Sequence, residues 1–105
     1  MKELVIYETF DGKAPFEEWL KGLDQPVRDI VRVRLDRLER GHAGHCEPVG
    51  EGVYELKIYF GPGYRVYFGE DSRELLVLLY GGDKGTQERD IHKARAYWQD
   101  YKRRQ

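Results

Sequence analysis

Apolar residues recur along the chain with two different periods. Short runs rich in β-branched and aromatic residues predict strands, at residues 3–9, 53–60, 64–68 and 74–80. Apolar positions three or four residues apart predict helices, at residues 11–23, 24–41 and 86–105. The resulting order, β-α-α-β-β-β-α, is that of a mixed α+β fold. The short connection between the first two helices predicts an αα-hairpin.

Local signals mark the ends of several of these elements. Asp24 and Thr86 stand where helix caps are expected, and the Gly-Pro-Gly turn at 61–63 predicts a β-hairpin. The glycine-rich stretch 41–52 is expected to be a loop. The run 74–80 has no polar alternation, which predicts an inner strand covered on both faces.

The predicted hairpin carries the main structural argument about function. Each of its strands has an apolar face and a polar face, and pairing must place the two apolar faces on the same side. A three-residue turn that satisfies this condition pairs Tyr59 with Arg65 and Lys57 with Tyr67. Lys57 and Arg65 are then diagonal neighbours, with about 7–8 Å between their backbones. One phosphate group could lie between two such side chains.

A third cation is expected close to this pair. The run 74–80 leads into a glycine-rich segment that contains Lys84 and ends at the start of a helix, where exposed amides favour anions. Lys57, Arg65 and Lys84 are therefore predicted to converge on one solvated face of the sheet, with Tyr59 and Tyr67 between them. The alternative is an ordinary cross-strand pair, in which Arg65 stacks on Tyr59 or bridges to Glu55.

Composition limits the classes of protein that the chain can belong to. Its 105 residues, 40% of them hydrophobic, suit one folded domain spanning 1–105. The net charge of −1 argues against a protein that coats nucleic acid by bulk attraction. The single cysteine, Cys46, cannot form an internal disulfide. No apolar run resembles a membrane span or an export signal, so we expect a cytoplasmic protein without membrane association.

Other candidate chemistry is weaker. His42, His45 and Cys46 lie within five residues but lack a second ligand cluster, which makes a zinc site improbable. His92 is expected on the exposed face of the last helix. No serine pairs convincingly with a histidine and an acid. The sequence therefore predicts neither a metal nor another cofactor.

Two segments together resemble a known superfamily. The run VYELKIYFGPGYRVYF (53–68), followed by LLVLLYGGDKGTQERDIHKA (75–94), resembles the RelE/ParE toxins of bacterial toxin–antitoxin modules. The most similar branch is the phage Gp49-like, HigB-like group of addiction module killer proteins. This resemblance implies a RelE-like fold, with a twisted, mostly antiparallel four-stranded sheet, an N-terminal helical hairpin and a C-terminal helix.

The resemblance also implies an activity. The better-known members are mRNA interferases, endoribonucleases that cut messenger RNA in the ribosomal A site. Arg65 matches the strand arginine that contacts the scissile phosphate, and Lys84 matches the lysine of the GGDK motif. Lys57 stands where related sequences commonly have arginine, which keeps the charge but loses bidentate geometry. These three residues are the expected catalytic residues.

The remaining expected roles concern substrate binding and proton transfer. Tyr59, Tyr67 and Gln87 are expected to bind substrate. The RNA supplies its own nucleophile, the 2′-hydroxyl, so positioned cations can stabilise the phosphorane without a metal. Lys57 is a candidate base if neighbouring cations lower its pKa. The chain has no obvious counterpart of a C-terminal catalytic tyrosine, for which Tyr97 and Tyr101 are the candidates.

The expected partners are the ribosome with its mRNA and a cognate antitoxin, a helix-turn-helix protein of the HigA-like kind. Two alternatives stay open at this point. One is a non-enzymatic inhibitor such as a ParE-like gyrase toxin. The other is a decayed, prophage-derived binding module.

Overall fold

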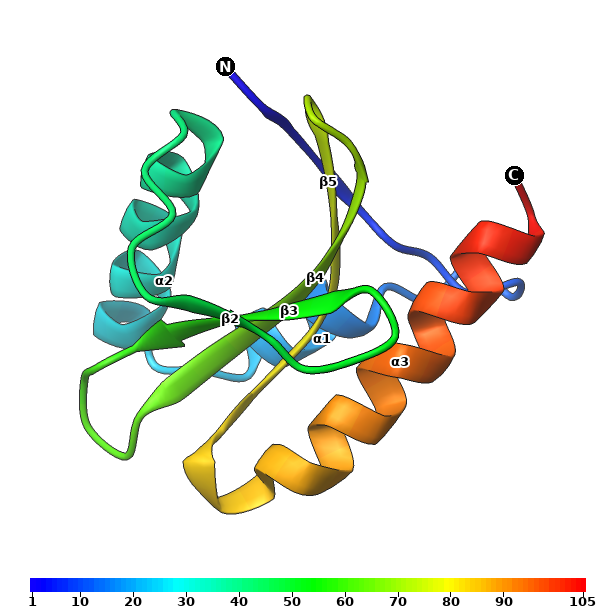
Figure 1. Cartoon of the computed structure of the whole chain (residues 1–105). Helices are drawn as coiled ribbons and strands as arrows, with labels where there is room; N and C mark the ends of the chain where they lie inside the picture. The colour runs from blue at the N-terminus through cyan, green and yellow to red at the C-terminus, as the bar shows by residue number, and fades with distance from the viewer.

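The computed structural model describes all 105 residues and has three α-helices and five strands. Figure 1 shows α2 and α3 on opposite sides of a strongly twisted sheet. The elements are β1 (Glu3–Ile6), α1 (Pro15–Lys21), α2 (Gln25–Glu39), β2 (Cys46–Pro48), β3 (Val53–Ile58), β4 (Tyr64–Ser72), β5 (Leu75–Asp83), the 3₁₀ turn η1 (Lys84–Thr86) and α3 (Gln87–Arg103). The α+β class and the two N-terminal helices are thus confirmed.

The sheet has five strands, so the prediction of four strands was wrong. Its order is β1-β5-β4-β3-β2, in which β1 runs parallel to β5 and the other neighbours are antiparallel. The additional strand, β2, lies within the predicted loop 41–52 and pairs with β3, with Cys46 opposite Leu56. Three residues with one proline carry no detectable alternation, so this edge strand depends on β3 as its template.

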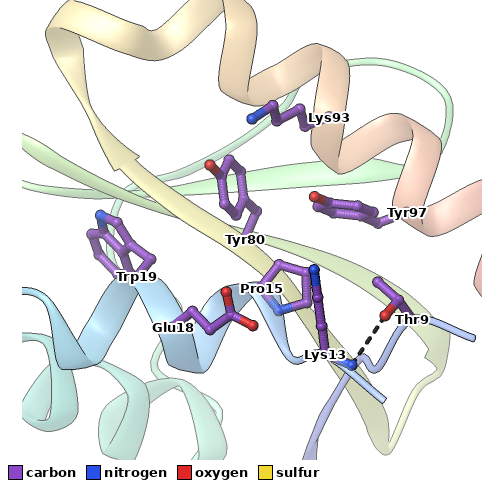
Figure 2. Close-up of a pocket in the computed structure, with 8 residues that line it drawn as sticks. All are labelled: Thr9, Lys13, Pro15, Glu18, Trp19, Tyr80, Lys93 and Tyr97. Carbon is purple, nitrogen blue, oxygen red and sulfur yellow. Dashed lines mark hydrogen bonds between the residues drawn. The ribbon is translucent and has the colours of Figure 1, made fainter. Parts of the chain in front are cut away.

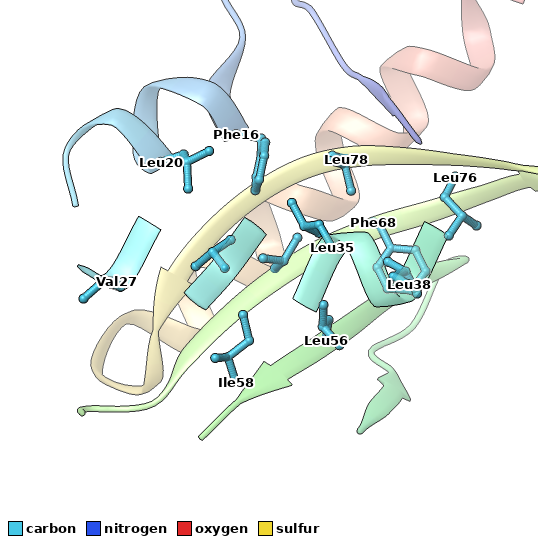
Figure 3. Close-up of a cluster of buried hydrophobic side chains, with 12 residues drawn as sticks. Phe16, Leu20, Val27, Leu35, Leu38, Leu56, Ile58, Phe68, Leu76 and Leu78 are labelled. Atoms are coloured by element: carbon cyan, nitrogen blue, oxygen red, sulfur yellow. The ribbon is translucent and has the colours of Figure 1, made fainter. Parts of the chain in front are cut away.

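Each face of the sheet has its own apolar core. The core under α1 and α2 contains Phe16, Leu20, Val27, Val31, Leu35, Leu38, Leu56, Ile58, Val66, Phe68, Leu76 and Leu78 (Figure 3). The core under α3 contains Tyr7, Val53, Tyr67, Val77, Leu79, Ala94 and Trp98. The helices predicted from the apolar periodicity therefore cover opposite faces of the sheet, α1 and α2 on one face and α3 on the other.

The apolar run of β5 is explained by these two cores. Leu76 and Leu78 enter the core under α1 and α2, while Val77 and Leu79 enter the core under α3. The strand lies between β1 and β4, so the prediction of an inner strand covered on both faces is confirmed. It also continues through Gly81 and Gly82 to Asp83, which were expected to lie in a loop.

The β3–β4 register differs from the prediction by two residues. The apolar faces coincide as expected, but Lys57 lies directly opposite Arg65 and Ile58 opposite Tyr64. The connecting loop therefore spans residues 59–63 instead of 61–63. Gly61 and Gly63 both have positive φ values, 56° and 83°, which lets this longer turn close. The alternation of apolar and polar residues in β3 and β4 determined which side chains share a face. The length of the turn determined which residues pair.

Neither predicted helix cap acts through its side chain. Asp24 and Thr86 precede α2 and α3, yet neither makes a side-chain cap hydrogen bond. The Thr86 hydroxyl instead donates to Asp90 Oδ2 at 2.5 Å. Asp83 caps η1 by accepting a hydrogen bond from the Gly85 amide at 2.8 Å.

Two glycines let tryptophans lie directly on the strands. A Cβ atom at Gly69 in β4 would overlap the ring of Trp98 from α3, and one at Gly81 in β5 would overlap Trp19 from α1. These close approaches set how near α1 and α3 lie to the sheet. None of the helices combines the length and the apolar character that crossing a lipid bilayer requires.

Candidate functional site

The three predicted cations lie at one end of the sheet, around the β3–β4 turn. Lys57 and Arg65 are direct cross-strand partners, and Arg65 lies opposite Gly82 of β5. The Lys84 amide donates to the Gly63 carbonyl at 2.9 Å, which ties the GGDK segment to the same turn. Lys84 itself is exposed. The backbone therefore brings the three positions together, by a different register from the one expected.

Arg65 does not stand on a solvated surface, as the sequence had suggested. Only 8% of the residue is exposed. Its Nε lies 3.6 Å from Glu55 Oε2, and its Nη1 donates to the Gly63 carbonyl at 3.2 Å. The bridge to Glu55 is the alternative considered above, although it is buried instead of solvated. The ion pair and this hydrogen bond orient the guanidinium, while Nε itself has no hydrogen-bond partner.

Glu55 is a buried carboxylate that binds both Arg65 and Gln87. It is 1% exposed, and besides Arg65 it accepts a hydrogen bond from Gln87 Nε2 at 2.7 Å. A charge at this depth is stable only with such partners. Gln87, expected to bind substrate, thus fixes the carboxylate behind Arg65 in this structure.

Tyr67 is fully buried, so the expectation that it lies beside substrate on a wet face does not fit this structure. Its hydroxyl has no hydrogen-bond partner. Burial raises the pKa of Tyr67, and the nearby carboxylates of Glu55 and Asp90 raise it further. The hydroxyl is therefore protonated at neutral pH. The sequence missed this because α3, distant along the chain, covers that part of β4.

Asp90, at the start of α3, is the second buried carboxylate of this region. It is 1% exposed and lies so close to Gly82 that any β-carbon there would overlap it. The Thr86 hydroxyl binds one carboxylate oxygen, while Oδ1 has no hydrogen-bond partner. Asp90 belongs to the DI pair that follows the GGDK motif, and the structure places it behind the site.

Lys57 is neutralised by a residue that sequence reasoning did not consider. Its Nζ lies 3.0 Å from Glu47 Oε2. The hydrogen bond to Glu47 raises the pKa of Lys57, and burial only partly opposes this effect. A general base needs a lowered pKa, so the structure speaks against Lys57 as the base.

Tyr59 lies in the turn after β3 and is 70% exposed. Its hydroxyl contacts Nδ1 of His45, and the two rings lie 5.4 Å apart. His45 Nε2 lies 3.1 Å from Glu47 Oε1, so a continuous chain of contacts runs from Tyr59 through His45 and Glu47 to Lys57. The only signal in the sequence was the spacing of His45 and Glu47. Residues two positions apart lie on the same face when the segment is a strand.

A separate hollow lies on the other side of β5, between α1 and α3. Its volume is about 400 Å³, and its walls include Trp19, Tyr80 and Tyr97 (Figure 2). Lys93 Nζ lies 5.5 Å from the centre of the Tyr80 ring, a cation–π distance. The six residues expected to be catalytic or substrate-binding do not line it, whereas Tyr97, considered above as a catalytic tyrosine, does.

The fold and this cationic sheet end define a small α+β protein that resembles bacterial toxins. Comparison with known families supports this class: the model of the phage-derived Gp49-like proteins matches residues 18–99. A Haemophilus influenzae protein, itself uncharacterized, is 38% identical over 86 residues, which cover 81% of this chain and 87% of that protein. The chain therefore belongs to the Gp49-like family, a phage-derived group of RelE-like addiction-module toxins.

Proposed function

We propose that this protein is the toxin of a type II toxin–antitoxin module and a metal-independent endoribonuclease that cuts ribosome-bound mRNA. The observation that carries the proposal is the cross-strand pair of Lys57 and Arg65, with the Lys84 segment hydrogen-bonded to the same turn. Three cationic side chains at one sheet end suit the binding of one phosphodiester. Family membership supports the toxin context.

The chemistry asks little more of the protein. The ribose 2′-hydroxyl attacks the adjacent phosphorus, and the developing dianionic phosphorane needs preorganised positive charge. Arg65 meets that need because Glu55 and the Gly63 carbonyl already fix its guanidinium. Glu47 has a half-exposed side chain, so an incoming phosphate can displace it from Lys57. Lys84 is exposed and can approach the same phosphate.

The partners follow from charge and from the exposed turn. A chain of net charge −1 needs another particle to hold its RNA, and the ribosome supplies that placement. Tyr59 and Phe60 expose large aromatic surfaces beside the cations, at 70% and 45%. A HigA-like, helix-turn-helix antitoxin is expected to cover this end of the sheet. Toxin, ribosome and antitoxin would meet in the cytoplasm.

The experiment compares cleavage by variants that should stay folded. Lys57→Met and Lys84→Ala, alone and combined, change one partly buried and one exposed side chain, and Lys21→Ala on α1 is the exposed control. After induction in a bacterial host, transcript 5′ ends are mapped with and without the neighbouring gene. We expect new 5′ ends for the unaltered chain and the control, and a loss of about 10²–10³ in cleavage for the double variant. Undiminished cleavage by the double variant would contradict the proposal.

One observation favours a second candidate, a non-enzymatic inhibitor of the gyrase-binding kind or a decayed binding module. Lys57 and Arg65 are already paired with Glu47 and Glu55, as in a purely structural arrangement. A DNA damage response with uncut transcripts would support the inhibitor. Harmless expression of a folded chain would support the decayed module.

A further inference from the structure

The structure aligns four polar side chains in an unbroken row beside the proposed phosphate site. In order they are Tyr59, His45, Glu47 and Lys57, with contacts between each neighbouring pair. The proposed reaction also needs a general base, and the raised pKa of Lys57 makes this lysine a poor one. We propose that His45 is the general base of this ribonuclease and that Glu47 is its positioning residue. This inference rests on the proposed function.

The carboxylate of Glu47 determines which ring nitrogen of His45 is free. An ionised carboxylate can only accept hydrogen bonds, so Nε2 carries the proton that it donates to Glu47 Oε1, 3.1 Å away. Hydrogen bonds from His45 and Lys57 lower the pKa of Glu47, which keeps it ionised. Nδ1 is then the unprotonated nitrogen, and in this structure it faces a hydroxyl group, that of Tyr59.

The backbone holds His45 in the same row as the two cations. The Lys57 amide donates to the His45 carbonyl at 2.9 Å, and Lys57 lies opposite Arg65. Neighbouring strands are roughly 5 Å apart, so His45 and Arg65 are separated by roughly 10 Å along this row. That span can accommodate a ribose at His45 and its phosphate at the cations. Tyr59 lies in an exposed turn, where it can yield its place to a ribose 2′-hydroxyl.

The proposed step balances without a metal or a further reactant. His45 Nδ1 takes the proton from the 2′-hydroxyl, and the 2′-oxygen forms a bond to phosphorus. The bond from phosphorus to the 5′-oxygen breaks, and the leaving oxygen takes a proton from the Lys57 ammonium group. Lys57 regains a proton from water, and the His45 imidazolium, stabilised by Glu47, releases its own to water. The products carry a 2′,3′-cyclic phosphate and a 5′-hydroxyl.

The charged and titratable groups around His45 come from four segments. Glu47 and Cys46 lie on β2, Lys57 lies on β3, and Tyr59 lies in the following turn. From α2, the Arg34 guanidinium lies against Gly44 and donates to the Lys57 carbonyl at 3.2 Å. Among these groups Glu47 is the carboxylate, and Arg34 and Lys57 are the cations.

The chain offers matched controls, because its two other histidines, His42 and His92, are also exposed. The purified full chain is mixed with ribosomes carrying a defined mRNA, and single-turnover cleavage is followed from about pH 5 to pH 8, where imidazoles titrate. We expect the rate of the unaltered chain, and of His42→Gln and His92→Gln, to rise with pH. His45→Gln should lose about 10²–10⁴ in rate together with that rise. Glu47→Gln should lose part of the rate, because an amide can donate as well as accept and no longer fixes which ring nitrogen of His45 is free, while the conservative Glu47→Asp should lose less.

The outcomes separate this inference from the proposed function. His45→Gln that cleaves as fast as His42→Gln, with the same pH dependence, would overturn the role of His45 and leave the ribonuclease intact. An unaltered chain that leaves the mRNA on programmed ribosomes uncut would overturn both. Tryptophan fluorescence of each variant confirms that it is folded, and the 2′,3′-cyclic phosphate end confirms the route.

Discussion

At the scale of single residues, a buried arginine decides the character of the site. Arg65 stands among aromatic residues on β4, a setting in which an exposed cation–π contact was one expectation. The structure instead buries it against Glu55, which is itself bound by Gln87. An ion pair at this depth loses much hydration, so each partner depends on the other. Burying the pair costs stability, but it holds the guanidinium in place.

Removing one partner of this pair should destabilise the fold more than removing both. Arg65→Met leaves the Glu55 charge buried without its cation, and we expect the free energy of unfolding to fall by about 3–5 kcal/mol. Adding Glu55→Gln, which keeps an acceptor for Gln87, should recover most of that loss. Urea denaturation followed by tryptophan fluorescence measures both variants.

The control is an exposed ion pair between an arginine and a carboxylate. Asp36 in the last turn of α2 and Arg40, which follows the helix, lie 3.2 Å apart with half or more of each side chain exposed, so Arg40→Met should cost at most about 0.5 kcal/mol. If Arg65→Met proved as harmless as Arg40→Met, the Arg65–Glu55 pair would not have the structural role assigned to it.

At the scale of elements, a strand of three residues completes the site. β2 supplies Glu47 and holds His45 beside β3, which is why Lys57 is paired and why a histidine lies near the cations. On the same face of the sheet, the position of α3 depends on Gly69, which lies under the Trp98 ring. Both effects come from contacts between elements far apart in the chain.

Filling the space at Gly69 should displace α3. A methyl group there would overlap Trp98, so we expect Gly69→Ala to lower the free energy of unfolding by about 1–3 kcal/mol. Gly22→Ala is the control, because its backbone is right-handed and its nearest neighbour, the Trp19 carbonyl oxygen, would be 3.5 Å away. Urea denaturation compares the two. Equal stability of both variants would show that α3 is not held at this point.

At the scale of the whole molecule, the charge distribution gives little attraction for free RNA. The net charge is −1, and two of the three cations at the sheet end are paired with carboxylates. Counterion release, the main source of affinity for free nucleic acid, is therefore small. If the protein is the proposed ribonuclease, a larger partner must deliver its substrate.

The chain should accordingly bind free RNA very weakly. At physiological salt we expect the fluorescence anisotropy of a labelled RNA of about 20 nucleotides to show no saturation below about 10⁻⁴ M protein. The same RNA placed as mRNA on a ribosome provides the comparison. Micromolar affinity for the free RNA, falling steeply with added salt, would contradict this account and favour a self-sufficient nuclease.

Much of the fold could be predicted because it follows from local periodicity. The alternation in β3 and β4 specifies which side chains share a face, and the uninterrupted run in β5 specifies an inner strand. The order of helices and strands follows from the same patterns, with one strand missing. These properties depend on residues close together in sequence, and burial of apolar side chains enforces them.

What only the tertiary structure decided is which polar groups meet. The five-residue turn set the register that places Lys57 opposite Arg65, and pairing with β3 created β2 and aligned His45 with Glu47. The packing of α3 buried Tyr67, and the contact with Glu55 accompanies the burial of Arg65. Each of these depends on contacts between segments distant along the chain, and a polar side chain shows no period that reveals its partner in advance.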